Sequence, residues 1–295
     1  MSTSSSPGAR RATRTPPTVS EARSRLAVLG SPISHSKSPA IQRAAYTALG
    51  LGWRYEAVEV TGETLGDFIT SRDETWRGLS LTMPLKRDVI PLLDWSDPLV
   101  DLVGGANTVL FTDDGLRGFN TDVYGVERSF VEAGHPALHS VLVIGAGATA
   151  ASVVAGVARL GATRISVQAR TPTRAAPLVT LGESLGVTVT LVAWGDTSGD
   201  VPDAVVSTLP GGDYGLGFPE AWRRASVLFD VAYDPWPSAL ATQWADARGA
   251  VIPGIELLLN QALGQVRIFL SGDPELPLSY EDRVMAAMRA SVWEY

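Results

Sequence analysis

A short apolar run that ends directly in a glycine-rich turn places the strongest constraint on how this chain can fold. Residues 141–144 read Val-Leu-Val-Ile, the continuous apolar stretch expected of a parallel strand covered on both faces. Gly145 and Gly147 follow, and with Ala150 they give the spacing Gly-x-Gly-x-x-Ala. Glycine permits a tight turn, and the following helix directs its free N–H groups and positive dipole end at that turn. The stretch predicts a dinucleotide-binding turn, whose cofactor contacts we assign to Gly145, Ala146, Gly147, Ala148, Thr149 and Ala150.

The second strand of the same unit indicates which dinucleotide binds. An NAD site usually carries an acidic residue about 20 residues further on, which bonds the ribose hydroxyl. Here the strand ends at residues 166–170, Ser-Val-Gln-Ala-Arg, and Arg174 follows with no acid between. Two guanidiniums can hold a phosphate through charge-assisted, fork-shaped hydrogen bonds. We therefore expect Arg170 and Arg174 to bind the 2′-phosphate of NADP(H), and the alternative is a pair of solvated surface arginines.

Composition narrows the possible function classes. The 24 basic and 31 acidic residues give a net charge of −7, so charge makes no general case for binding nucleic acid or an anionic membrane. No apolar run approaches the roughly 20 residues that a membrane span needs. The chain has no cysteine and only three histidines, His35, His135 and His139. We expect a small-molecule substrate, no metal, a cytoplasmic location, and a monomer or homodimer.

The order of the expected elements indicates an α/β protein built from two units. Residues 1–23 are rich in Ser, Thr, Pro and Arg, and we expect a disordered tail there, with an organelle transit peptide as the alternative. Strand and helix patterns alternate over residues 26–119, and again over 141–252 at the spacing of a doubly wound parallel sheet. Two more helices, over 255–270 and 280–293, are too few to form a domain, so they must pack on an earlier unit.

A reaction that moves a hydride also needs a group that handles the accompanying proton. Without cysteine and with few histidines, Lys, Asp or Tyr must supply it. Lys86 stands out because residues 78–85 before it carry no charge, and Asp122 stands out at the start of a helical pattern. From the residues alone, simpler roles are preferable: Lys86 as a surface cation, and Thr121 or Asp122 as the cap of the helix.

Six segments, in order along residues 26–270, resemble the shikimate dehydrogenase family. Six motifs in the right order are far more specific than the glycine turn alone. The segments are Gly30-Ser-Pro-Ile-Ser-His-Ser-Lys-Ser-Pro39, Gly78-Leu-Ser-Leu-Thr-Met-Pro-Leu-Lys86, Gly105-Ala-Asn-Thr108, Gly118-Phe-Asn-Thr-Asp122, the glycine turn, and Gly254-Ile-Glu-Leu-Leu-Leu-Asn-Gln261.

The resemblance implies two α/β domains, with an NADP-binding Rossmann domain over residues 122–253 inserted into a substrate-binding domain of residues 24–121 and 254–295. It implies the reversible reduction of 3-dehydroshikimate to shikimate with NADPH, and it makes Lys86 and Asp122 the catalytic pair. The implied substrate contacts are Ser34, Ser36, Ser80, Thr82, Asn107, Tyr233 and Gln261. The cofactor contacts beyond the turn and the two arginines are Thr171, Thr208 and Gly254.

Three departures from the family pattern bear on fine specificity more than on reaction type. Ser80 stands where many members carry asparagine, Ala169 replaces the usual asparagine before the first arginine, and Ala148 replaces a common glycine. We expect the contact at Ser80 to be shorter, water-mediated or lost.

Three other functions remain open at this point. The first is a quinate or aminoshikimate dehydrogenase of the same fold, against which Ser36 and the two arginines argue. The second is a non-catalytic NADP-binding sensor, which should have lost Lys86 or Asp122. The third is a tetrahydrofolate-type dehydrogenase, which would not require the serine loop of residues 30–39.

Overall fold

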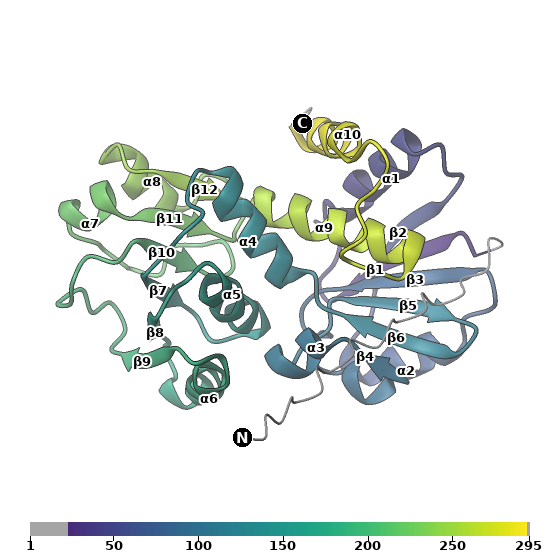
Figure 1. Ribbon diagram of the computed structural model, residues 1–295, viewed down its shortest axis with the longest axis horizontal. Helices are drawn as coiled ribbons and strands as arrows, with labels where there is room; N and C mark the ends of the chain where they lie inside the picture. The colour runs from purple at the N-terminus through teal and green to yellow at the C-terminus, as the bar shows by residue number, and fades with distance from the viewer. Residues whose placement is uncertain (1–22, 294–295) are drawn as a thin grey trace, which may run out of the picture.

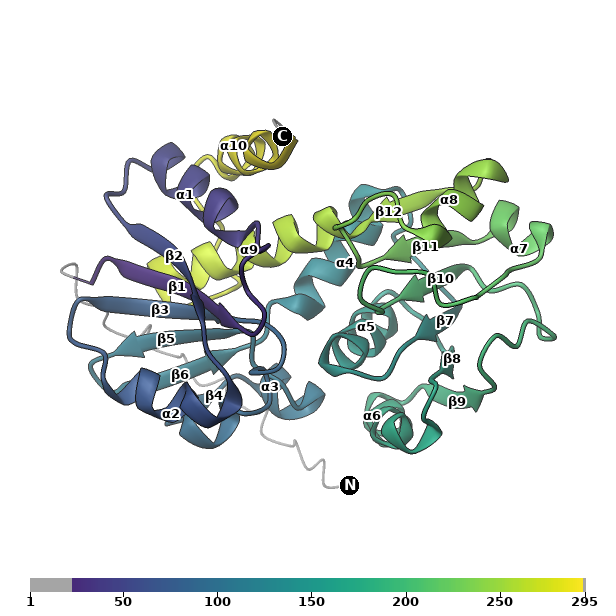
Figure 2. The ribbon, with the colours of Figure 1, turned by 180° about the vertical axis from the view of Figure 1, so that it is seen from behind.

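Residues 23–293 are described by the computed structural model, and they form two β-sheets joined by the helices α4 (Asp122–Glu132) and α9 (Gly254–Ser271) (Figures 1 and 2). Of the tail expected over residues 1–23, only Arg23 lies within the described residues. None of the helices in this part of the chain is long and apolar enough to span a membrane.

The first sheet is mixed. It consists of β1 Arg25–Gly30, β2 Arg54–Glu59, β3 Trp76–Leu81, β4 Trp95–Ser96, β5 Thr108–Thr112 and β6 Gly115–Phe119. The spatial order is β2-β1-β3-β5-β6-β4, in which β2, β1 and β3 run parallel while β5 is antiparallel to both of its neighbours. Strands β5 and β6 form an antiparallel hairpin over residues 108–119.

The second sheet is wholly parallel. Its strands are β7 Ser140–Ile144, β8 Arg164–Gln168, β9 Thr188–Val192, β10 Ala204–Ser207, β11 Val227–Asp230 and β12 Val251–Pro253. Their order is β12-β11-β10-β7-β8-β9, so the chain starts in the middle at β7, builds outward to β9, and then returns to build out to β12. This is the doubly wound order of dinucleotide-binding sheets, in which ligands bind where the direction of building reverses, here beyond β7 and β10.

Helices cover both faces of the second sheet. Alternate residues of β7 show the division, since Val141 and Val143 lie in one core and Leu142 and Ile144 in another. The first core lies under α5 (Ala148–Arg159) and α6 (Ala176–Leu185), and the second under α7 (Glu220–Ala225) and α8 (Ala239–Asp246). Burial on both faces explains why these strands are apolar throughout.

The first sheet is covered in the same way. On one face α1 (Ser38–Ala48) packs with α9 and α10 (Glu281–Trp293), and on the other lie α2 (Gly62–Thr70) and α3 (Pro98–Val103). Figure 2 shows α10 lying beside α1, although the two helices are far apart in the sequence. The two C-terminal helices therefore pack on the first unit, as expected for helices too few to form a domain of their own.

Short elements are where the sequence and the structure differ. Helix α7 and strand β4 were not expected, because six and two residues are too short to show a periodic pattern. A 3₁₀ turn over Pro172–Arg174, also too short for a periodic pattern, precedes α6.

Glycines allow α4 to approach its neighbours closely. A Cβ at Gly264 of α9 would lie 3.1 Å from the Cβ of Thr121, just before α4. On the opposite side, a Cβ at Gly156 of α5 would lie 2.9 Å from the Cβ of Val126 and 3.2 Å from the carbonyl oxygen of Val123. Through these positions α4 packs closely against α5, which covers the second sheet, and against α9, which covers the first.

We predict that Gly156→Ala lowers the stability of the protein, even though alanine favours a helix by about 1 kcal/mol over glycine. The added methyl group must displace α4, and overpacking of this kind costs roughly 1–3 kcal/mol. Gly66→Ala in α2 is the matched control, because a Cβ there meets nothing within 4 Å. In thermal unfolding, Gly66→Ala should raise the midpoint and Gly156→Ala should lower it. A rise for both variants would contradict the close packing of α4 and α5.

Candidate active site

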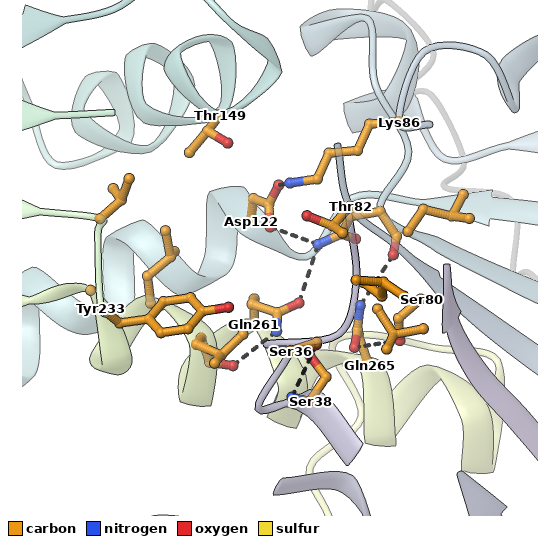
Figure 3. A pocket seen from close by; sticks show the side chains of 18 of the residues that line it. Ser36, Ser38, Ser80, Thr82, Lys86, Asp122, Thr149, Tyr233, Gln261 and Gln265 are labelled. Atoms are coloured by element: carbon orange, nitrogen blue, oxygen red, sulfur yellow. Dashed lines mark hydrogen bonds and ion pairs between the residues drawn. The ribbon is translucent and has the colours of Figure 1, made fainter. Parts of the chain in front are cut away.

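A cavity of about 340 Å³ opens between the two sheets and is lined by both units. Its wall takes side chains from the serine loop of residues 30–39, from β3 and the turn after it, and from α4, α5 and α9. Figure 3 shows how the polar groups of these elements converge.

Lys86 and Asp122 form an ion pair in the cavity wall. The Lys86 Nζ donates to Asp122 Oδ2 at 2.6 Å, and the two side chains are 14% and 6% exposed. Lys86 lies in the turn after β3, where its carbonyl oxygen accepts from the Ala106 N–H at 2.8 Å. Asp122 is the first residue of α4, so the helix dipole also favours its negative charge. Lys86 is therefore not the isolated surface cation that its sequence context allowed.

Asn107 fixes the second oxygen of Asp122. This side chain is 1% exposed, and its Nδ2 donates to Asp122 Oδ1 at 2.7 Å and to Thr121 Oγ1 at 2.9 Å. Its Oδ1 accepts from the Thr121 N–H at 2.9 Å and from the Thr108 hydroxyl at 2.8 Å. The shortest hydrogen bonds of this amide all join Thr108, where β5 begins, and the start of α4, so Asn107 orients Asp122.

The cap of α4 differs from the one expected. Neither Thr121 nor Asp122 caps the helix with its side chain. The Oδ1 of Asn120 instead accepts from the N–H groups of Asp122 and Val123 at 3.0 and 3.3 Å. The reason is that Thr121 and Asp122 are bound to Asn107 and Lys86. Because Asn120 caps the helix, both oxygens of the Asp122 carboxylate are available to Lys86 and Asn107.

Ser80 belongs to a chain of buried hydrogen bonds at the base of the cavity. Its hydroxyl donates to Gln265 Oε1 at 2.8 Å and accepts from the Tyr55 hydroxyl at 2.6 Å. Gln265 in turn donates to the Asn107 carbonyl oxygen at 3.1 Å. Burial raises the pKa of Tyr55 above its ordinary value, which keeps the phenol protonated as a donor. Because the Ser80 hydrogen is used by Gln265, Ser80 offers a ligand only an acceptor.

The serine loop places two of its hydroxyls in the cavity wall. Ser36 and the buried Ser38 line the cavity, and the Ser38 N–H donates to Ser36 Oγ at 3.3 Å. Ser34 is exposed and lies outside the wall, so the structure does not bring this expected residue into the site. Thr82 also lines the cavity, two residues beyond Ser80 on the same side of the chain.

Tyr233 and Gln261 line the cavity from the side of the second sheet and from α9 (Figure 3). Burial, with a contribution from Asp234, raises the pKa of Tyr233, so its phenol remains a hydrogen-bond donor. Gln261 Nε2 donates to the Leu258 carbonyl oxygen at 2.9 Å, and its Oε1 lies 3.4 Å from Asn107 Nδ2. Both side chains can therefore present polar atoms to a ligand beside the Lys86–Asp122 pair.

The glycine turn between β7 and α5 is tight at Gly145 and open at Gly147. Gly145 has a φ of +113°, and a Cβ there would collide with the Thr208 hydroxyl, which is held by the Ile144 carbonyl oxygen at 2.9 Å. A Cβ at Gly147 would meet nothing within 4 Å, so open space lies over the start of α5. The first N–H groups of this helix lack intrahelical acceptors and can bind an anion.

The remaining residues assigned to the cofactor have different surroundings. Ala146 and Ala148 are half-buried, whereas Ala150 is fully buried in the core and serves helix packing. Thr149 and Gly254 both line the cavity (Thr149 is labelled in Figure 3). A Cβ at Gly254 would collide with the backbone of Val231, so this position requires glycine.

Arg170, Thr171 and Arg174 are exposed just beyond the end of β8. Within residues 23–293 neither guanidinium forms an ion pair with a carboxylate. Two such cations at the second strand of a doubly wound sheet can bind a phosphate. The same described residues contain no cluster of three potential metal ligands.

The sequence did not single out Ser38 or Gln265, both of which line the cavity. Ser38 begins α1 beside Pro39, where a serine usually signals a helix start. Gln265 lies one helical turn after Gln261, so the i, i+4 spacing on α9 was the available signal.

These features define a class: an α/β oxidoreductase architecture in which a doubly wound, dinucleotide-type sheet faces a second unit, with a lysine–carboxylate ion pair where the two units meet. Residues 28–109 match the family model of the shikimate dehydrogenase substrate binding domain. The shikimate dehydrogenase (NADP(+)) of Rubrobacter xylanophilus is 34% identical over 270 residues, which are 88% of this chain and 95% of that protein.

Solved structures agree. The shikimate dehydrogenase of Mycobacterium tuberculosis matches with a TM-score of 0.78 and 36% identity over 90% of this chain and 99% of that one. The shikimate 5-dehydrogenase of Thermus thermophilus, in complex with NADP(H) and shikimate, matches with a TM-score of 0.76 and 29% identity over 91% and 100%. The chain belongs to the shikimate dehydrogenase family.

Proposed function

We propose that this protein is an NADP-dependent oxidoreductase that reversibly reduces 3-dehydroshikimate to shikimate. The observation that carries the proposal is the Lys86–Asp122 pair, whose Nζ and Oδ2 atoms lie 2.6 Å apart in the wall of a polar cavity. The same cavity reaches Thr149 of α5, beside the glycine turn. The names of the related proteins and the complex of the Thermus thermophilus enzyme support the same substrate and cofactor.

The residues present fit NADP(H). The turn at Gly145 and Gly147 leaves room over the start of α5, where backbone N–H groups would bind the pyrophosphate. Arg170 and Arg174, with Thr171 between them, would bind the 2′-phosphate. The Thr208 hydroxyl donates to the Ile144 carbonyl oxygen, directly before the turn, and so stabilises it. When bound, NADPH supplies the hydride that reaches the substrate carbonyl carbon.

The cavity wall fits a small acid with several hydroxyls. We assign Ser36 and Ser38 to the carboxylate, in place of the Ser34 and Ser36 expected from the sequence. Thr82, Tyr233 and Gln261 would read the ring hydroxyls, and Ser80 would accept a hydrogen from one of them. A site built on many hydrogen bonds discriminates strongly against analogues that lack a hydroxyl, because its polar groups are then left unpaired.

Lys86 and Asp122 act on the reacting oxygen. The Lys86 ammonium donates a hydrogen bond to the carbonyl oxygen, which gains negative charge as the carbon is reduced. Asp122 holds the ammonium in place and is itself held by Asn107. The pair supplies the proton that completes the alcohol, and in the reverse direction it removes that proton.

The two sheets support the proposed domain bounds of 24–121 with 254–295 for substrate and 122–253 for cofactor. These bounds divide the chain so that each domain contains one sheet. We further propose a cytoplasmic enzyme that is a monomer or homodimer.

A steady-state assay with shikimate and quinate, each with NADP and with NAD, tests the function. We expect shikimate with NADP to give the highest kcat/KM, because two exposed arginines and two cavity serines suit this pair of ligands. Comparable turnover of quinate with NAD would replace the proposal by its nearest alternative, and no turnover with any pair would favour a sensor.

Lys86→Met tests the catalytic pair. Loss of a positioned proton-transferring group costs about 10²–10⁴-fold in rate, so kcat should fall by this order while the Kd of NADPH stays unchanged. Arg87→Met is the matched control, since it removes a cation from the adjacent, exposed position. Both variants should be checked for folding by thermal unfolding. If Lys86→Met loses no more activity than Arg87→Met, Lys86 is not catalytic.

The double variant Arg170→Ala/Arg174→Ala tests the phosphate site. A hydrogen bond to a charged group contributes about 1.5–3 kcal/mol, so NADPH affinity should fall roughly 10-fold or more. The affinity for NADH should change little, because NADH lacks the 2′-phosphate. Arg164→Ala, which removes an exposed cation from the opposite end of β8, should leave both affinities unchanged. Unchanged discrimination between NADPH and NADH in the double variant would refute the assignment.

A further inference from the structure

We propose that Tyr214 is a positioning residue for the Arg170 guanidinium, and through it a determinant of the preference for NADP(H) over NAD(H). This inference rests on the proposed role of Arg170 in binding the 2′-phosphate. It assigns a specific role to the loop of residues 208–217, which follows β10 and is distant in sequence from Arg170.

Tyr214 and Arg170 meet across two loops. The guanidinium carbon of Arg170 lies 5.5 Å from the centre of the Tyr214 ring, within the range of a cation–π contact. Arg170 has no carboxylate partner within the described residues. Asp213, the acid next to Tyr214, accepts from the N–H of Gly215 at 2.9 Å. The aromatic ring is therefore the contact that restrains this guanidinium.

The position of the ring is itself fixed by its loop. The Tyr214 hydroxyl donates to the Pro210 carbonyl oxygen at 3.0 Å. Two residues on, Leu216 is buried, and its carbonyl oxygen accepts from Gln243 Nε2 at 2.8 Å. Earlier in the loop, a Cβ at Gly211 would lie 2.8 Å from the Asp234 carbonyl oxygen, so this part of the loop packs against the segment after β11. A ring that is held by its hydroxyl, on a loop packed both before and after it in sequence, can restrict the arginine.

The contact suits a phosphate clamp because a cation–π contact attracts the charge of the guanidinium without using its N–H groups as hydrogen-bond donors. These N–H donors remain available for a phosphate. An exposed arginine otherwise samples many rotamers, and ordering it on binding costs affinity. Restraint before binding reduces that cost for NADP(H) alone, since only this cofactor uses the 2′-phosphate contact.

Replacing the ring tests the proposal, with Kd values for NADPH and NADH measured on the full-length protein. Exposed cation–π contacts contribute at the level of about a 2- to 5-fold change in an equilibrium constant, so Tyr214→Leu should raise the Kd of NADPH by this factor and leave that of NADH unchanged. Tyr214→Phe keeps the ring and should retain most of the discrimination. Equal losses in the Leu and Phe variants would overturn the role of the ring face.

The background of Arg170→Ala separates this inference from the proposed function. If Tyr214 acts through Arg170, then Tyr214→Leu has no further effect on NADPH binding once the arginine is absent. If Tyr214→Leu raises the Kd of NADPH by the same factor with and without Arg170, the inference is overturned. If Arg170→Ala weakens NADPH binding but Tyr214→Leu does not, the clamp stands and only the role of Tyr214 is refuted. If Arg170→Ala leaves the Kd of NADPH unchanged, both the clamp assignment and the inference fail.

Discussion

The contact between α4 and α9 is the constraint on which the rest of the structure depends. Helix α9 is buried on nearly all sides and contributes side chains to the cores of both sheets. Helix α4 packs into the core of the second sheet while its first residue, Asp122, bonds to Lys86 of the other unit. Gly264 allows the two helices to approach at the level of Thr121. The ends of these helices therefore determine where the cavity lies and which groups enter it.

Because of this arrangement, the two halves of the site differ in how well they tolerate substitutions. On the first sheet, the groups around Asn107 and Ser80 are buried and mutually bonded, so a change in one disturbs several others. On the second sheet, the groups proposed to bind the cofactor are backbone N–H groups after Gly145 and the exposed arginines. Under the proposed function, the reaction chemistry lies in the mutually bonded part and cofactor discrimination in a part that can vary with little effect on the core.

Much of the fold could be predicted because parallel strands covered on both faces are apolar throughout, and because glycine and proline mark the element ends. Helix α7 escaped prediction since six residues show no period. The site was harder to predict than the fold. Lys86 and Asp122 are 36 residues apart in the sequence, and only tertiary packing brings them together. The serine loop shows the limit most clearly, because composition cannot say that Ser38 faces the cavity while Ser34 faces solvent.

The complete use of the Asn107 amide by neighbouring protein groups has one more consequence. A carboxylate aligned by the substrate would have to be reoriented in every catalytic cycle. Here two groups of the protein itself, Lys86 and Asn107, hold the two oxygens of Asp122, so its alignment is established when the chain folds. New substrate specificities can then evolve through changes in the cavity wall that faces the proposed substrate, while the orientation of the Lys86–Asp122 pair is retained.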